Sequence, residues 1–113
     1  MTRWTWMERR REQRQRERAE RQAHIDALAD LEPRLRARRC STLLIRERSH
    51  VQLQVDTGPD RASLSERIVV VCIRVGDVLT YKSMGGLDFG PVDEPDAAAE
   101  QVAERVAFRA GDE

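Results

Sequence analysis

The sequence has few of the residues on which covalent and metal chemistry depend. Its 113 residues include two cysteines and two histidines. Cys40 and Cys72 have neither the spacing of a zinc site nor the number that a disulfide framework needs. We therefore expect no metal and no cofactor, and we expect both thiols to stay reduced.

Long hydrophobic runs are also absent. The longest uninterrupted apolar run is IVVVCI, residues 68–73, which is far short of the roughly 20 residues that a membrane helix needs. The first residues, MTRWTWMERR, contain no apolar stretch of the kind found in a secretory signal. These absences predict a cytoplasmic protein that makes no membrane contact.

One stretch lacks any large apolar side chain. Residues 9–22, RRREQRQRERAERQ, consist of arginine, glutamate, glutamine and one alanine. Such a segment cannot contribute to a hydrophobic core, although its residues favour a helix. We therefore predict an Arg-rich helical extension over residues 1–24 and a single α+β domain over residues 25–110.

Charge is divided unevenly along a chain whose net charge is +0. Residues 1–39 hold 12 Arg against 7 Asp and Glu, a balance of +5, and residues 40–113 hold 8 Arg and Lys against 13 Asp and Glu, a balance of −5. A basic segment beside an acidic body can bind an external polyanion or the body of a second copy. Both possibilities follow from the same pattern.

After the Arg-rich stretch, an apolar stripe with helical spacing begins. Ile25, Leu28, Leu31 and Leu35 fall at intervals of three, three and four residues, which indicates one buried helix face. Pro33 lies inside this stripe. Because proline removes a backbone donor and disfavours helical geometry at the preceding residue, the sequence predicts a kink or break near residues 31–33.

From Cys40 onward the apolar pattern changes to a period of two, which indicates strands. Ser49-His50 and Gly76-Asp77 supply hairpin turns, Gly85-Gly86 supplies a third turn, and residues 58–66 form a loop. The predicted strands are 41–48, 51–57, 67–75, 78–84 and a short LDF strand.

A final helix is predicted over residues 96–109, with Asp93 as its cap and Pro95 in its first turn. The fold class is therefore α+β. We expect a four- to five-stranded antiparallel β-meander, with a long Arg-rich N-terminal helix and a C-terminal helix packed on one face.

The order from LADLEPRLRARR to GLDFGPVDEPDAAAEQVAERV resembles a group of small, functionally uncharacterised helix–β-meander–helix proteins of GC-rich actinobacteria. The resemblance covers roughly residues 25–108 and leaves out the arginine stretch. Those proteins often carry Trp where this chain has Leu79 or Tyr81. Since the group has no assigned activity, the resemblance implies an architecture only.

An enzyme would need a nucleophile beside a base, and the candidates are Cys40 or Cys72 with His24 or His50. Cys72 lies in the middle of an apolar run, where a thiol usually acts as a small inert side chain. Cys40, at a strand edge, is the more accessible of the two. We predict that the protein is not an enzyme.

The candidate contact residues lie in the N-terminal extension. On a helix Arg10, Arg14, Arg18 and Arg21 fall within about 80° of one another. Trp4 and Trp6 precede this Arg stripe, and exposed aromatic side chains often mark contact sites. The predicted partner or phosphate contacts are Trp4, Trp6, Arg10, Arg14, Arg18 and Arg21.

Three interpretations of this extension remain open. The first is a non-enzymatic interaction module that forms a homo-oligomer, or binds a protein with an acidic surface, through the basic helix. The second is a weak nucleic-acid-binding accessory protein that uses the Arg stripe on phosphates. The third is a solvated helix of mixed charge without a specific partner. No small-molecule ligand is predicted.

Overall fold

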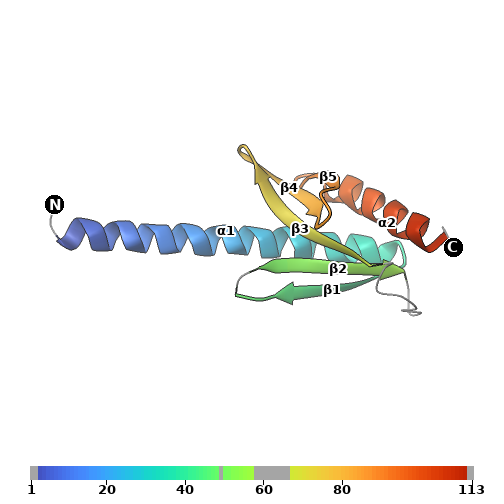
Figure 1. The fold of residues 1–113 in the computed structure, drawn as a ribbon, viewed down its shortest axis with the longest axis horizontal. Coiled ribbons are helices and arrows are strands. Elements are labelled where there is room, and N and C mark those ends of the chain that lie inside the picture. The colour runs from blue at the N-terminus through green and yellow to red at the C-terminus, as the bar shows by residue number, and fades with distance from the viewer. Residues whose placement is uncertain (1–2, 49, 58–66, 112–113) are drawn as a thin grey trace.

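The computed structural model describes residues 3–48, 50–57 and 67–111. It contains two helices and five strands in the order helix, five strands, helix (Figure 1). This is the predicted α+β class. The elements are α1 (Arg3–Ala37), β1 (Cys40–Arg46), β2 (Val51–Thr57), β3 (Ile68–Val75), β4 (Val78–Ser83), β5 (Asp88–Pro91) and α2 (Pro95–Gly111).

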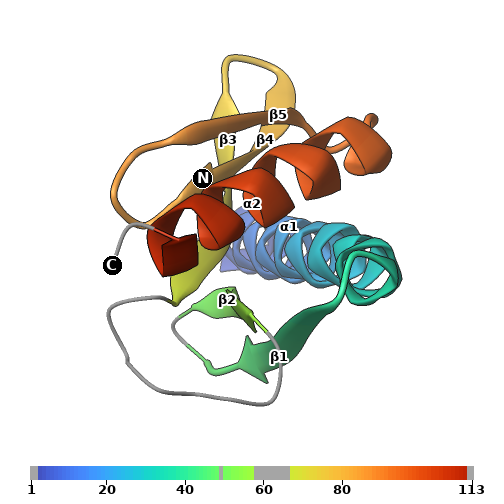
Figure 2. The same cartoon turned by 90° about the vertical axis from the view of Figure 1, so that its right-hand side faces the viewer.

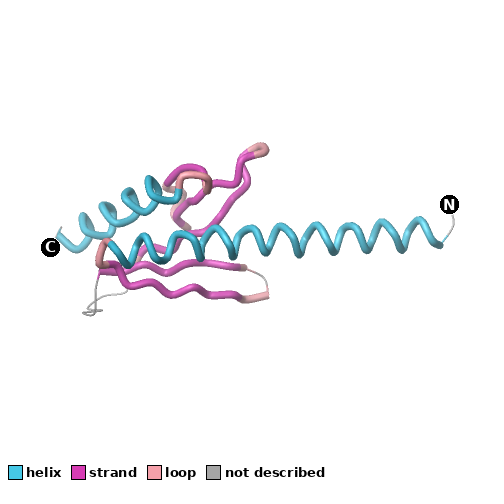
Figure 3. The backbone as a smooth tube through the Cα atoms, turned by 180° about the vertical axis from the view of Figure 1, so that it is seen from behind, coloured by secondary structure: helices cyan, strands magenta, loops and turns pink. Residues whose placement is uncertain are grey.

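Helix α1 is a single element of 35 residues, and it makes the molecule long, with extents of 64 × 24 × 22 Å. Its C-terminal half lies against the sheet, whereas its N-terminal half extends past every strand (Figures 1 and 3). We call residues 3–19 the arm. Every side chain from residue 6 to residue 19 is exposed.

Pro33 does not break α1, so of the predicted kink or break near residues 31–33 the break is wrong. The residues on both sides of it explain why. Leu28, Leu31 and Leu35 are fully buried, and burying each leucine stabilises the fold by about 1.5–3 kcal/mol. Together they outweigh the roughly 3 kcal/mol by which proline is disfavoured inside a helix.

The five strands form one antiparallel sheet in the order β1-β2-β3-β4-β5, which is a meander. The first hairpin pairs Leu44 with Leu53 and is closed by a hydrogen bond from Glu47 N to His50 O of 3.0 Å. The β3–β4 turn contains Gly76 at a φ of 63°, a conformation that favours glycine. The predicted hairpin over Gly76-Asp77 is therefore confirmed.

Both helices lie on the same side of the sheet, which curves around them (Figure 2). The core between them consists of alternate strand residues and the apolar stripes of the two helices. Tyr81 is fully buried there, and its hydroxyl donates a hydrogen bond of 2.6 Å to the carbonyl of Ala27. The fully buried large side chains are Tyr81, Leu28, Leu31, Leu35, Leu53, Val55, Val70, Val102 and Val106.

The other sheet face is uncovered within the described residues. Four large apolar side chains point to this side, as the alternation along the strands requires, and they are 44–56% exposed. They are Leu43, Ile73, Val75 and Val78. β3 is the middle strand of the order, as the apolar character of its two faces predicted.

Helix α2 begins at Pro95, so Glu94 precedes the first helical residue in place of the predicted cap Asp93. The amide of Ala98 donates to the Glu94 carbonyl at 3.1 Å, the first hydrogen bond of the helix. Proline suits the first helical position because it lacks a backbone N–H, and an N–H at that position would have no partner within the helix.

The predicted loop at 58–66 and Ser49 of the first turn lie outside the described residues. Among the described helices, none has a stretch both long enough and apolar enough to cross a membrane.

Candidate functional site: a basic groove where α1 leaves the sheet

One face of α1 packs against the core, and we call the row of residues along this face the seam. The same residue spacing continues into the arm, where the apolar side chains are replaced by charged ones. Counting back from Leu35, intervals of four and three residues alternate through Leu31, Leu28, His24, Arg21, Glu17, Arg14 and Arg10. This is the spacing of residues that share one helix face. The leucines are buried against the sheet, His24 is partly buried, and the residues before it are exposed. The seam thus becomes charged where the sheet ends.

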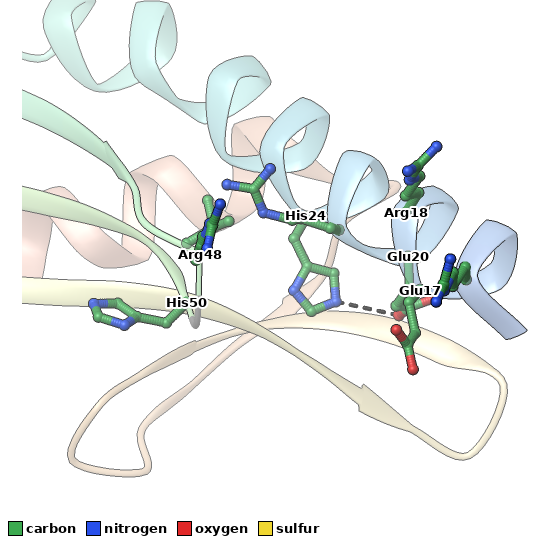
Figure 4. Close-up of a pocket in the computed structure, with 9 residues that line it drawn as sticks. Glu17, Arg18, Glu20, His24, Arg48 and His50 are labelled. Atoms are coloured by element: carbon green, nitrogen blue, oxygen red, sulfur yellow. Dashed lines mark hydrogen bonds and ion pairs between the residues drawn. The ribbon is translucent and has the colours of Figure 1, made fainter.

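At this junction α1 and the β1–β2 hairpin form a groove of about 490 Å³. In Figure 4, Glu17, Glu20 and His24 project from one side of α1, with Arg48 and His50 on the hairpin. Arg18 points away from His24. The lining residues are Arg14, Glu17, Arg18, Glu20, Arg21, His24, Arg48, His50 and Val51.

Glu20 ties the helix to the sheet beside this groove. It accepts hydrogen bonds of 3.0 and 2.9 Å from Nε and Nη2 of Arg74 on β3, and His24 Nε2 lies 3.1 Å from its Oε1. The hydrogen bonds from Arg74 lower the pKa of Glu20 most, and the contact with His24 lowers it further. The hydrogen bonds between Arg74 and Glu20 also raise the pKa of Arg74. The charge of Glu20 is therefore already compensated.

A second tie joins α1 to the other wall of the groove. Arg21 Nη2 donates a hydrogen bond of 3.1 Å to the carbonyl of Glu47, next to the β1–β2 turn. By contrast, no hydrogen bond or ion pair within the described residues engages Arg14, Arg18 or Arg48. Within the described residues these three guanidinium groups are therefore not paired with a carboxylate, although Glu17 also lines the groove.

Trp6, one of the predicted contact residues, lies near the tip of the arm. Trp6 is 60% exposed, and the guanidinium carbon of Arg10 lies 4.7 Å from the centre of its ring, a cation–π distance. The adjacent Met7 is 55% exposed. The backbone of Trp4 belongs to α1, but its side chain lies outside the described residues.

The structure places the predicted contact residues in two groups. Arg14, Arg18 and Arg21 line the groove, whereas Arg10 and Trp6 lie farther along the arm. Arg48 is not among the contacts that the sequence predicted, and the two histidines were considered there only as catalytic bases or metal ligands. The four–three spacing through His24 was available in the sequence, but the position of Arg48 depends on how the hairpin packs against the helix.

Neither cysteine lies in the groove. Burial raises the pKa of Cys72 to about 12 and also raises that of Cys40, and both side chains are buried. Because the thiolate is the nucleophile, such thiols are poorly reactive at neutral pH. Across the described ranges, no three His, Cys, Asp or Glu side chains are grouped as metal ligands would be.

Comparison of this chain with protein-family models, with curated proteins and with solved structures finds no match in any of the three. The resemblance to small actinobacterial proteins thus stays a prediction.

Proposed function

We propose that this protein is a non-enzymatic interaction module that self-associates through the basic arm of α1. The observation that carries this proposal is a match between two charged stripes. Arg10, Arg14 and Arg18 are exposed and four residues apart on the arm. The second stripe, on α2, is also exposed with four-residue spacing and consists of Asp96, Glu100 and Glu104.

Equal spacing allows several contacts to form at once between two helices. Four residues rise about 6 Å along an α-helix, so the positive and negative charges repeat at the same distance along the two stripes. A single arginine–carboxylate pair would not select a partner, whereas three in step favour one alignment.

The arm of one chain cannot reach α2 of the same chain. α1 is one continuous helix that extends away from the body, and its N-terminus lies at the opposite end of the molecule from α2 (Figure 1). The arm and the acidic stripe can therefore meet only between copies. In a two-fold dimer each arm would contact the other copy's body, and the contact would form twice.

The contact should be weak and sensitive to salt. Exposed ion pairs contribute about 0–1 kcal/mol each, and Asp96 already accepts a hydrogen bond of 2.8 Å from Arg34 of its own chain. The exposed Trp6 and Met7 at the arm tip supply apolar area that ion pairs lack. Association is therefore expected at high protein concentration and low ionic strength.

Charge exchange between the two stripes tests the proposal. The variant Arg10→Glu with Arg14→Glu should be monomeric by sedimentation under conditions where the intact chain associates. The variant Glu100→Arg with Glu104→Arg should also be monomeric alone. A mixture of the two variants should associate, because each supplies the charge that the other has lost.

The matched control is Arg9→Glu with Arg16→Glu, which changes the net charge equally on the far side of the same helix. It should associate as the intact chain does. If the intact chain is monomeric at low salt and high concentration, the proposal is wrong. It is also wrong if the control loses association as fully as the stripe variant.

A further inference from the structure

The groove has a second property, although its lining shares Arg14 and Arg18 with the stripe proposed for self-association. We propose that the groove between α1 and the β1–β2 hairpin binds a small ligand that carries linked phosphate groups. The proposal rests on the side chains of the groove wall, including Arg48, which belongs to neither of the two stripes.

The charge balance of the lining favours an anion. Four arginines line the groove against two glutamates, and Glu20 is already held by Arg74. Arg14, Arg18 and Arg48 make no hydrogen bond or ion pair within the described residues. An anion in the groove would balance these guanidinium groups.

The backbone segments that form the walls of the groove are held together without a ligand. The Arg21 bond to the Glu47 carbonyl holds the β1–β2 turn against α1. The paired bonds from Arg74 to Glu20 hold the β3 end against the same part of the helix. Walls that are already in place lose less conformational freedom on binding, so that the cost of ordering falls mainly on the arginine side chains.

The donor set suits phosphate better than a carboxylate. A guanidinium presents five N–H donors in a planar fork, and three such groups exceed what one carboxylate can accept. A phosphate monoester carries a charge of about −1.5 to −2 and three acceptor oxygens. Linked phosphates would therefore engage arginines from both walls together.

The volume of the groove and its lining residues narrow the class of ligand further. A volume of about 490 Å³ lies within the roughly 300–1,000 Å³ of small-molecule sites. No Trp, Tyr or Phe is among the nine lining residues, and the imidazoles of His24 and His50 are the only aromatic rings there, so the described groove offers little ring surface on which a nucleic-acid base could stack. Recognition would depend on the phosphates.

The probe is sodium tripolyphosphate, added to the full-length protein at constant ionic strength and followed by NMR of backbone amides. We expect saturable shifts at the groove. Arg48→Gln should weaken binding about tenfold, the scale of one lost charge-assisted contact. The matched control is Arg46→Gln on the same hairpin, an exposed arginine outside the groove lining, and it should bind as the unmodified chain does.

Three outcomes would overturn the proposal: shifts that do not saturate, equal loss of affinity in the two variants, or Arg48-dependent binding of a short single-stranded oligonucleotide without binding of tripolyphosphate. The last outcome would assign the groove to nucleic acid. Sedimentation of Arg48→Gln keeps this test separate from self-association, because Arg48 lies outside both stripes and its loss should leave association unchanged.

Discussion

Glu20 on α1 and Arg74 on β3 are 54 positions apart, yet two hydrogen bonds of 3.0 and 2.9 Å join their side chains. The pair lies where α1 passes the end of the sheet. On the N-terminal side of it every residue of the arm from 6 to 19 is exposed, and on the other side the apolar seam is buried. It therefore marks the boundary between the arm and the packed body.

The Glu20–Arg74 pair predicts a specific pH dependence. The folded state lowers the pKa of Glu20 below its ordinary value of 4.5, so the ionised carboxylate stabilises the fold above that pH. This contribution is lost as the pH falls through the lower, folded pKa. Glu20→Gln should be less stable than the unmodified chain at neutral pH, and the difference should shrink on acidification.

Urea unfolding at a series of pH values measures this effect. Glu12→Gln is the control, since Glu12 is exposed on the arm and makes no hydrogen bond or ion pair within the described residues. If the Glu20 and Glu12 variants show the same pH profile, the pair has no role in stability.

The seam leucines should dominate the stability of the packed body. Leu31 is fully buried, and Leu31→Ala should lower the free energy of unfolding by about 2–5 kcal/mol because it leaves a cavity. Leu43→Ala is the matched control. Leu43 is 56% exposed on the uncovered sheet face, and its loss should cost no more than about 0.5 kcal/mol. Similar losses in both variants, measured by chemical denaturation, would contradict the assigned core.

Pro33 should be replaceable with a gain in stability. Its side chain is exposed, and it lies inside a continuous helix, where alanine is favoured by about 3 kcal/mol. Against this, alanine leaves the unfolded chain more flexible than proline does, which lowers stability by roughly 0.4–1 kcal/mol. Pro33→Ala should therefore raise the free energy of unfolding by about 2 kcal/mol in urea titrations. A loss of stability would mean that the helix needs the proline geometry here.

Thiol labelling tests the inertness of Cys72. Its pKa of about 12 leaves little thiolate near pH 8, and the side chain is buried. In a Cys40→Ser variant, which isolates it, an aromatic disulfide reagent should react slowly in native buffer and rapidly in denaturant. Equal rates in the two solvents would show an accessible, activated thiol and would revive the enzyme hypothesis.

Local patterns in the sequence were sufficient to predict most of the fold. Strand periodicity and the Gly76-Asp77 turn predicted the antiparallel hairpins, and the stripe from Ile25 to Leu35 predicted the buried face of α1. These signals depend on neighbours within a few residues of one another. The Asp93 cap was misplaced because Pro95 suits the first helical position and leaves Glu94 before it.

The sequence by itself determined where the seam of α1 changes from leucine to arginine, and so where packing against a sheet has to stop. Only the tertiary structure decided that α1 continues through Pro33, because the stabilising contacts come from distant strands and α2. The same holds for the groove. Arg48 meets the arm's arginines only because the β1–β2 turn is held against α1 by contacts such as Arg21 to Glu47, which join residues 26 positions apart.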